Sequence, residues 1–150
     1  MSIDQIVLSP ATYLTSAPGT AKNDTTILPE SGGGVSEPPP GGSDERVIYA
    51  SEAAIVGPQW TVESDSTAAG GAALVSPNRG VGKIVIAHAS PASYAELTFT
   101  AEAGRPYRLW LRSRAERNYW GNDSAHVQFS GTVDEAGGPV YTILPRSPEN

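Results

Sequence analysis

Apolar and polar residues alternate along three runs, residues 96–101, 107–112 and 125–130, and this period of two is typical of half-buried β-strands. One face of the runs consists of Leu97, Phe99, Ala101, Tyr107, Leu109, Leu111, Ala125, Val127 and Phe129. Residues 103–106, Ala-Gly-Arg-Pro, combine a glycine and a proline in the way that tight turns require. The pattern predicts an antiparallel hairpin followed by a third strand, with one face forming a core wall.

The opposite face of these runs carries Arg108, Trp110 and Arg112, with His126 and Gln128 on a neighbouring strand. A sugar ring stacks its C–H groups on an indole, and its hydroxyls pair with planar polar side chains. This face therefore favours carbohydrate binding. The alternative is that Trp110 packs beneath a second sheet or a loop, with the arginine stems lying around it.

The beginning of the chain predicts a separate strand. Ile3, Ile6, Val7 and Leu8 precede Pro10, which ends the run, and the strand is expected to be buried on both sides near its end. A lone strand leaves backbone groups unpaired, so it must join a sheet elsewhere. The connection over residues 10–45, roughly 36 residues, reaches on the order of 100 Å when extended, so the sheet can belong to this chain or to a neighbour.

Composition divides the chain into three parts. Residues 1–30 are a strand and a polar tail, and residues 31–46 form a linker rich in glycine and proline. Residues 47–150 form the module, in which further strands are expected at 47–50, 60–62, 73–75, 83–87 and 140–143. About eight short strands separated by turns predict an all-β fold, an antiparallel β-sandwich or jelly roll with a displaced amino-terminal strand.

Charge and composition exclude several classes of protein. The net charge of −6 opposes a nucleic-acid partner, which would require clustered Lys and Arg. The chain has no cysteine and no apolar run long enough to span a membrane. Residues 1–4 show no secretory signal, so a protein that works outside the cell would take its export signal from elsewhere or from a longer precursor.

Five stretches, residues 48–53, 67–71, 94–99, 104–112 and 122–129, resemble in order the carbohydrate-binding modules of the galactose-binding-like jelly-roll type. The likeness covers about 80 residues. Residues 2–8 resemble the closing strand of that family, which normally stands at the carboxyl end and pairs beside the opening strand. The chain therefore looks as if it were cut across a tandem-repeat boundary. We expect the family's usual binding loop to be missing after residue 143, which favours a structural role.

The resemblance implies a non-catalytic, extracellular or cell-surface bacterial module that binds polysaccharide. Its candidate sugar-binding residues are Trp110, Arg108, Arg112, Tyr119, Trp120 and Asn122. The Asn122-Asp123 pair is equally suited to capping backbone groups in a turn. The resemblance also implies a structural calcium ion, with Glu52, Glu63 and Asp65 as candidate ligands, although no dense acidic loop of the EF-hand kind is present. No other cofactor is expected.

Catalysis has little support in the sequence. Only His88 and His126 titrate near neutral pH, and neither accompanies a nucleophile motif. Residues 78–83 lack the first glycine and the Ser or Thr of a phosphate-binding loop. We therefore predict that the chain is not an enzyme.

Two functions follow. The first is polysaccharide binding by a β-sandwich module. The second is a structural subunit of an extracellular filament, in which Ile3, Ile6, Val7 and Leu8 fill a vacancy in an identical neighbouring subunit. Head-to-tail strand donation makes contacts that do not close on themselves, so open fibres are its natural product.

Overall fold

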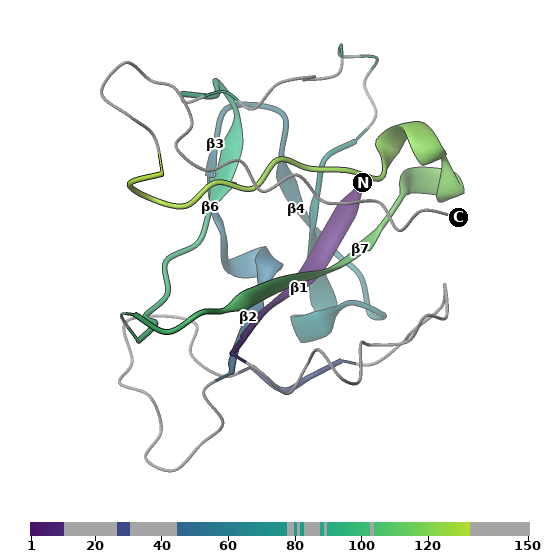
Figure 1. Cartoon of the computed structure of the whole chain (residues 1–150). Helices are drawn as coiled ribbons and strands as arrows, with labels where there is room; N and C mark the ends of the chain where they lie inside the picture. The colour runs from purple at the N-terminus through teal and green to yellow at the C-terminus, as the bar shows by residue number, and fades with distance from the viewer. Residues whose placement is uncertain are drawn as a thin grey trace.

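The computed structural model describes residues 1–10, 27–30, 45–77, 80, 82, 88, 90–102 and 104–132. These residues are all-β, with seven strands in two antiparallel sheets and several short 3₁₀ turns (Figure 1). The strands are β1 (Ser2–Ser9), β2 (Arg46–Tyr49), β3 (Ala54–Val56), β4 (Thr61–Ser64), β5 (Ala72–Val75), β6 (Tyr94–Glu96) and β7 (Arg108–Arg114). The 3₁₀ turns are η2 (Ala50–Glu52), η3 (Ala69–Gly71), η4 (Glu116–Asn118) and η5 (Trp120–Asn122).

Strand β1 lies in the middle of a five-stranded sheet, which confirms the strand predicted at the beginning of the chain. Along one edge it pairs with β2 over Gln5 to Leu8, and with β5 at Ser2 and Ile3. Along its other edge it pairs with β7 from end to end, while β4 extends the sheet beyond β5 (Figure 1). The strand thus lies beside the opening strand of the module, and in this structure it does so within one chain.

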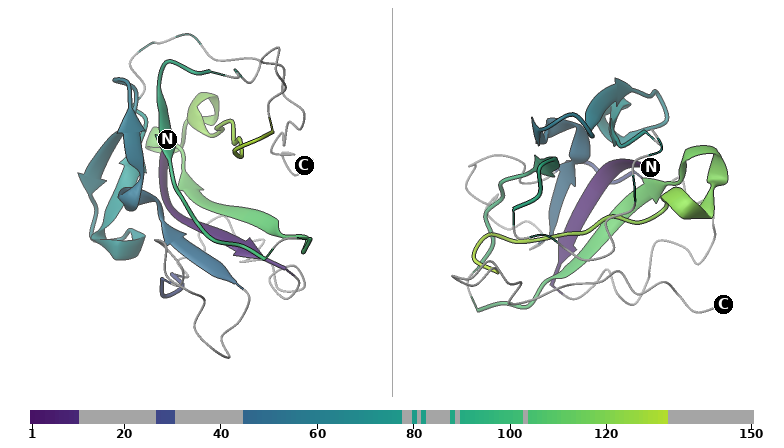
Figure 2. Two further views of the ribbon diagram at one scale, coloured as in Figure 1. Left: turned by 90° about the vertical axis from the view of Figure 1, so that its left-hand side faces the viewer. Right: turned by 90° about the horizontal axis from the view of Figure 1, so that it is seen from above.

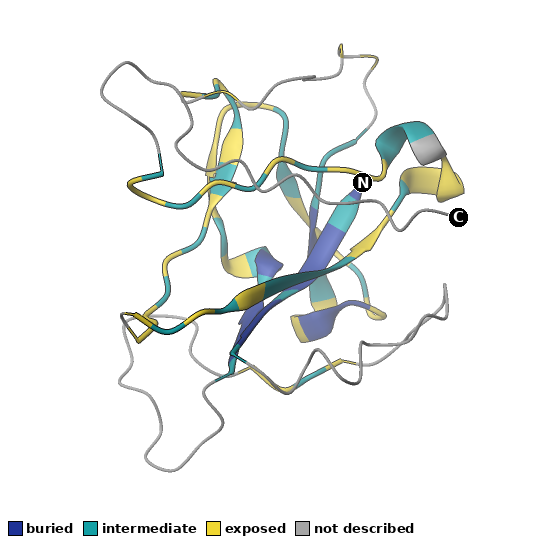
Figure 3. Ribbon diagram, viewed as in Figure 1, coloured by how far each residue is buried: buried dark blue, intermediate teal, exposed yellow. Residues whose placement is uncertain are grey.

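Buried residues gather on β1 and on the turns beside it (Figure 3). The core cluster consists of Met1, Ile3, Ala50 and Leu74, against which Ile6, Ala53, Trp60, Ala95 and Ala125 pack. The end of β1 is buried on both faces, as predicted, because Val7 and Leu8 are 3% and 4% exposed. Two neighbouring residues of a strand point to opposite faces, so both faces of the sheet are covered at this point.

A second layer covers one face of this sheet. Strands β3 and β6 form a separate two-stranded sheet, and Ala95 of β6 packs against the core cluster together with Ala125. The rings of Phe99 and Phe129 meet edge to face, with centroids 6.3 Å apart. Figure 2 shows the larger sheet curled. This arrangement confirms the all-β antiparallel class and is consistent with a β-sandwich, while the jelly-roll strand order stays a prediction.

The predicted hairpin between residues 96–101 and 107–112 is wrong. Strand β7 pairs with β1, and residues 97–101 form no strand. The buried Arg46 side chain holds that segment instead, since its Nε donates to the Thr100 carbonyl over 3.0 Å. Residues 125–130, predicted as a third strand, contain only a single bridge, at Val127. Alternation identifies a strand but not its neighbour, and β1 offers eight extended residues for pairing.

Several predictions lie outside the described residues, namely the strands at 83–87 and 140–143 and most of the linker at 31–46. The division of the chain into three parts therefore stays a prediction. Within the segments that are described, no helix has the length and apolar character needed to cross a membrane.

Candidate functional site

The docked strand β1 is the candidate site, because it joins the first residues of the chain to strands drawn from residues 46–114. Six of its eight residues are buried. The residues predicted to drive its docking lie in the sheet as expected: Ile3, Val7 and Leu8 are buried, and Ile6 stands between Ile48 of β2 and Leu111 of β7. Burying an aliphatic side chain of this size stabilises the docked state by about 1.5–3 kcal/mol.

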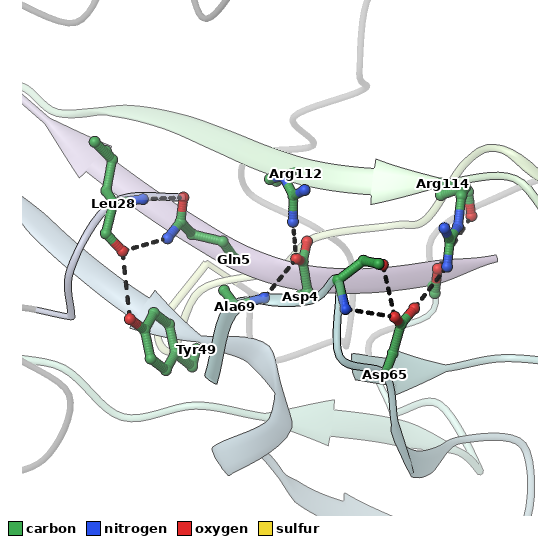
Figure 4. A network of polar contacts seen from close by, with 10 residues as sticks. Asp4, Gln5, Leu28, Tyr49, Asp65, Ala69, Arg112 and Arg114 are labelled. Carbon is green, nitrogen blue, oxygen red and sulfur yellow. Dashed lines mark hydrogen bonds and ion pairs between the residues drawn. The ribbon is translucent and has the colours of Figure 1, made fainter. Parts of the chain in front are cut away.

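A β-bulge interrupts the pairing of β1 with β7. Ile3 faces Ser113 and Gln5 faces Arg112, so Asp4 is an extra residue without an opposite partner in the ladder. A bulge redirects the side chain that it adds. The buried Asp4 carboxylate accepts a hydrogen bond from the Ala69 backbone N–H over 2.8 Å and forms an ion pair with Arg112 (Figure 4). A buried carboxylate requires such partners, because charge is costly to remove from water.

The side chain of Gln5, next to Asp4, bonds to Leu28 in the segment of residues 27–30 from the tail (Figure 4). Tyr49 lies directly opposite Gln5 in the β1–β2 ladder and bonds to the same segment. The Tyr49 ring lies against Gly70, where an added Cβ atom would be 2.6 Å from the ring Cδ2 atom. Gly70 also has a φ of +68°, so both space and backbone conformation require glycine at this position.

The carboxylates predicted to bind calcium have other surroundings. Asp65 accepts bonds from the hydroxyl and the N–H of Thr67, which hold its pKa below the ordinary value, and it pairs with Arg114 over 2.7 Å. Burial and the neighbouring Glu52 raise the pKa of Glu30. Among the described residues no three acidic or histidine side chains come together as a metal site, so Glu52, Glu63 and Asp65 do not form one cluster.

The predicted sugar-binding residues on β7 lie beside β1. Trp110 is half-buried opposite Val7, and Arg108 is exposed opposite Ser9. Arg112 is engaged by the buried Asp4 carboxylate, so its guanidinium stabilises the docked strand. The alternative for this face, packing of Trp110 beneath a second sheet or a loop with the arginine stems around it, stays a prediction.

The other three predicted sugar-binding residues belong to the turns after β7. Tyr119 is 48% exposed, and its ring lies against Gly121, where a Cβ atom would approach Tyr119 Cε1 to 2.5 Å. The Asn122 Oδ1 accepts a hydrogen bond from the Met1 amino group over 2.7 Å, and burial lowers the pKa of that amino group. Trp120 belongs to η5, and its side chain lies outside the described structure.

The six predicted sugar-binding residues do not form one compact cluster. Arg108 lies at the Ser9 end of β1, whereas Asn122 lies at the Met1 end. Eight residues of β-strand separate the two ends by about 25 Å. The structure brings the strand-docking residues together and spreads the sugar-binding residues along the strand.

Asp4, Gln5 and Tyr49 were not among the site residues predicted from the sequence. The available signal was the polar pair Asp4-Gln5 inside an otherwise apolar strand. Adjacent strand residues point to opposite faces, so two consecutive polar residues in a buried strand indicate polar contacts in the interior.

Comparison of the chain with models of known protein families, with curated proteins and with solved structures found no match. The geometry of the docked strand is therefore the main guide to function.

We expect Arg112→Met to lower the free energy of unfolding by about 3 kcal/mol, because it leaves the Asp4 carboxylate buried without its charged partner. Arg108→Met is the matched control on the same strand, and its exposed side chain predicts a change within about 0.5 kcal/mol. Urea denaturation followed by tryptophan fluorescence measures both. Equal effects of the two substitutions would contradict the structural role of Arg112.

We expect Gly70→Ala to destabilise the fold by about 3 kcal/mol, since it adds both a strained φ and a clash with the Tyr49 ring. Gly71→Ala separates the two effects, because Gly71 has a similar φ of +77° and open space where its Cβ would lie. The control should cost only about 1 kcal/mol. Thermal unfolding compares the variants, and indistinguishable midpoints would show that the Tyr49 ring does not lie on Gly70.

Proposed function

We propose that the chain is a structural subunit that assembles head to tail by donating strand β1 to an identical neighbour. The observation that carries this proposal is the position of β1 at the centre of the sheet, paired along both edges with strands from residues 46–114. A strand that completes a sheet binds through main-chain hydrogen bonds and through pockets for alternate side chains. The same bonds form whether the strand comes from its own chain or from another.

The connection between β1 and β2 also supports exchange. Leu8 and Arg46 are directly opposite each other in the ladder, so a tight turn of two to five residues would join these strands. The chain instead uses roughly 36 residues, rich in glycine and proline, which reach on the order of 100 Å when extended. A connection far longer than closure requires lets β1 reach a neighbour, and the contact then repeats from subunit to subunit without closing.

The resemblance to carbohydrate-binding modules of the galactose-binding-like jelly-roll type supports an extracellular location for this assembly. In that family the closing strand stands at the other end of the module, next to the opening strand. The pairing of β1 with β2, the first strand of residues 46–114, supports this comparison. The proposed filament would thus be a series of modules, each completed by the strand of the preceding one.

A pair of cysteines tests strand donation directly, because the natural chain has none. Ser2 and Arg114 are ladder partners on β1 and β7, and antiparallel partners lie about 4.5–5.5 Å apart between Cα atoms, within disulfide range. In the Ser2→Cys, Arg114→Cys chain, exchange predicts a ladder of covalent oligomers on a non-reducing gel. Docking within one chain predicts monomers with an internal disulfide at every concentration, which would refute exchange.

Deletion of residues 1–10 supplies the control for assembly. The truncated chain has no β1 to donate, so electron microscopy should show filaments for the full chain and none after truncation. Filaments that persist without β1 would show that another surface drives assembly. A synthetic peptide of residues 1–10 should bind the truncated chain. It should also raise the thermal stability of that chain, because a ligand that binds only the folded state stabilises it.

A second candidate function, polysaccharide binding, is favoured by the turn that carries Tyr119. Tyr119 is 48% exposed, its ring lies close to Gly121, and it precedes Trp120 in the sequence. An exposed aromatic ring fixed in this way provides a stacking surface for a sugar.

We expect affinity electrophoresis through gels containing different glycans to show retardation that is lost in Tyr119→Ala, because the exposed ring supplies the stacking surface. Tyr94→Ala on β6 is the matched control, since Tyr94 is a 37% exposed tyrosine on a different sheet. Absence of retardation by every glycan, or equal retardation of the two variants, would reject this function.

A further inference from the structure

The Gln5 side chain is almost completely buried, with 2% exposure. It forms hydrogen bonds with the backbone of Leu28, 23 residues further along the chain. Its Nε2 donates to the Leu28 carbonyl over 2.8 Å, and its Oε1 accepts from the Leu28 N–H over 3.3 Å. The side-chain amide thereby takes the place of a neighbouring strand, since it satisfies both backbone groups of one residue (Figure 4).

Tyr49 extends this contact along the segment. Its hydroxyl donates to the Leu28 carbonyl over 3.4 Å and accepts from the Glu30 N–H over 3.2 Å. Gln5 and Tyr49 are opposite each other in the β1–β2 ladder, so their side chains emerge side by side on one face. We call these two side chains the backbone clamp.

The segment suits the clamp through its backbone. Pro29 biases Leu28 toward an extended conformation. The clamp accepts hydrogen bonds from the N–H groups of Leu28 and Glu30, and Pro29 between them has no N–H to satisfy. The side chain of Ile27 is 42% exposed, and Pro29 and Glu30 are exposed as well. Each of the four hydrogen bonds joins the clamp to main-chain atoms of Leu28 or Glu30.

We infer that the backbone clamp is a binding site for an extended polypeptide, that residues 27–30 are its occupant in this structure, and that it accepts the same stretch from a second copy of the chain. Recognition through main-chain atoms is the mode by which strands are added to sheets. A buried amide side chain is costly without partners, so the clamp favours an occupied state. The inference stands without strand exchange, because the clamp is complete within one chain.

The experiment uses the whole chain with Leu28→Pro and Glu30→Pro, which removes both main-chain N–H donors of the resident segment and so vacates the clamp. The probe is a fluorescent peptide of residues 25–31, followed by anisotropy. We expect saturable binding, and binding at least tenfold weaker when the peptide carries an N-methyl group on Leu28, because the donor to Gln5 Oε1 is then lost. The Ile27→Ala peptide is the matched control and should bind within twofold of the parent peptide.

Because both peptides meet the same protein, the comparison does not depend on the folding of a variant. Gln5→Met in the vacated chain keeps the length of the side chain and removes the amide, so it should also weaken binding at least tenfold. No binding by the vacated chain, equal binding of the N-methyl peptide, or equal binding to Gln5→Met would each overturn the inference.

Hydrogen exchange in the intact chain gives a second measurement that needs no vacated variant. The Leu28 amide should exchange at least tenfold more slowly than in the free peptide, and Gln5→Met should abolish most of that protection while Ile27→Ala leaves it unchanged. A Leu28 amide that exchanges as fast as in the free peptide would also overturn the inference.

Discussion

The need to pair the backbone of β1 on both edges is the constraint on which the rest of this structure depends. β2 and β7 do not pair with each other, so β1 is the element that joins them into one sheet. Without it, each would expose a row of unsatisfied N–H and C=O groups, and Ile3, Val7 and Leu8 would leave the core. Strands β2, β5 and β7 join one sheet only through the first strand of the chain, across a connection of roughly 36 residues.

The polar residues inside β1 set its register. A slip of one position would turn every side chain to the opposite face, and would separate Asp4 from Arg112 and from the Ala69 N–H. The same slip would move Gln5 away from Tyr49 and leave its buried amide without the Leu28 backbone. Asp4 and Gln5 therefore add register-specific polar contacts to the apolar burial that drives docking.

The sequence predicted what depends on local pattern and missed what depends on distant partners. Alternation and turn residues located β1, β2, β5 and β7, and Gly104 has the positive φ expected of its turn, 79°. The hairpin was predicted wrongly because a period of two identifies a strand but carries no information about which strand lies beside it. The bulge at Asp4 and the opposition of Gln5 and Tyr49 depend on register across more than 40 residues, which no local pattern encodes. The sugar-binding prediction grouped residues by their type, and the structure distributed them along β7 and its following turns.

The backbone clamp and the docking of β1 are thermodynamically linked. Gln5 comes from β1 and Tyr49 from β2, so the clamp exists only while these strands are paired, and whatever free energy the 27–30 segment gains from binding stabilises that pairing equally. If β1 docks on a neighbouring copy, Gln5 is supplied by one subunit and Tyr49 by the next. Residues 27–30 would then form hydrogen bonds with both subunits. These bonds would make the contact between the subunits more stable than pairing of β1 alone.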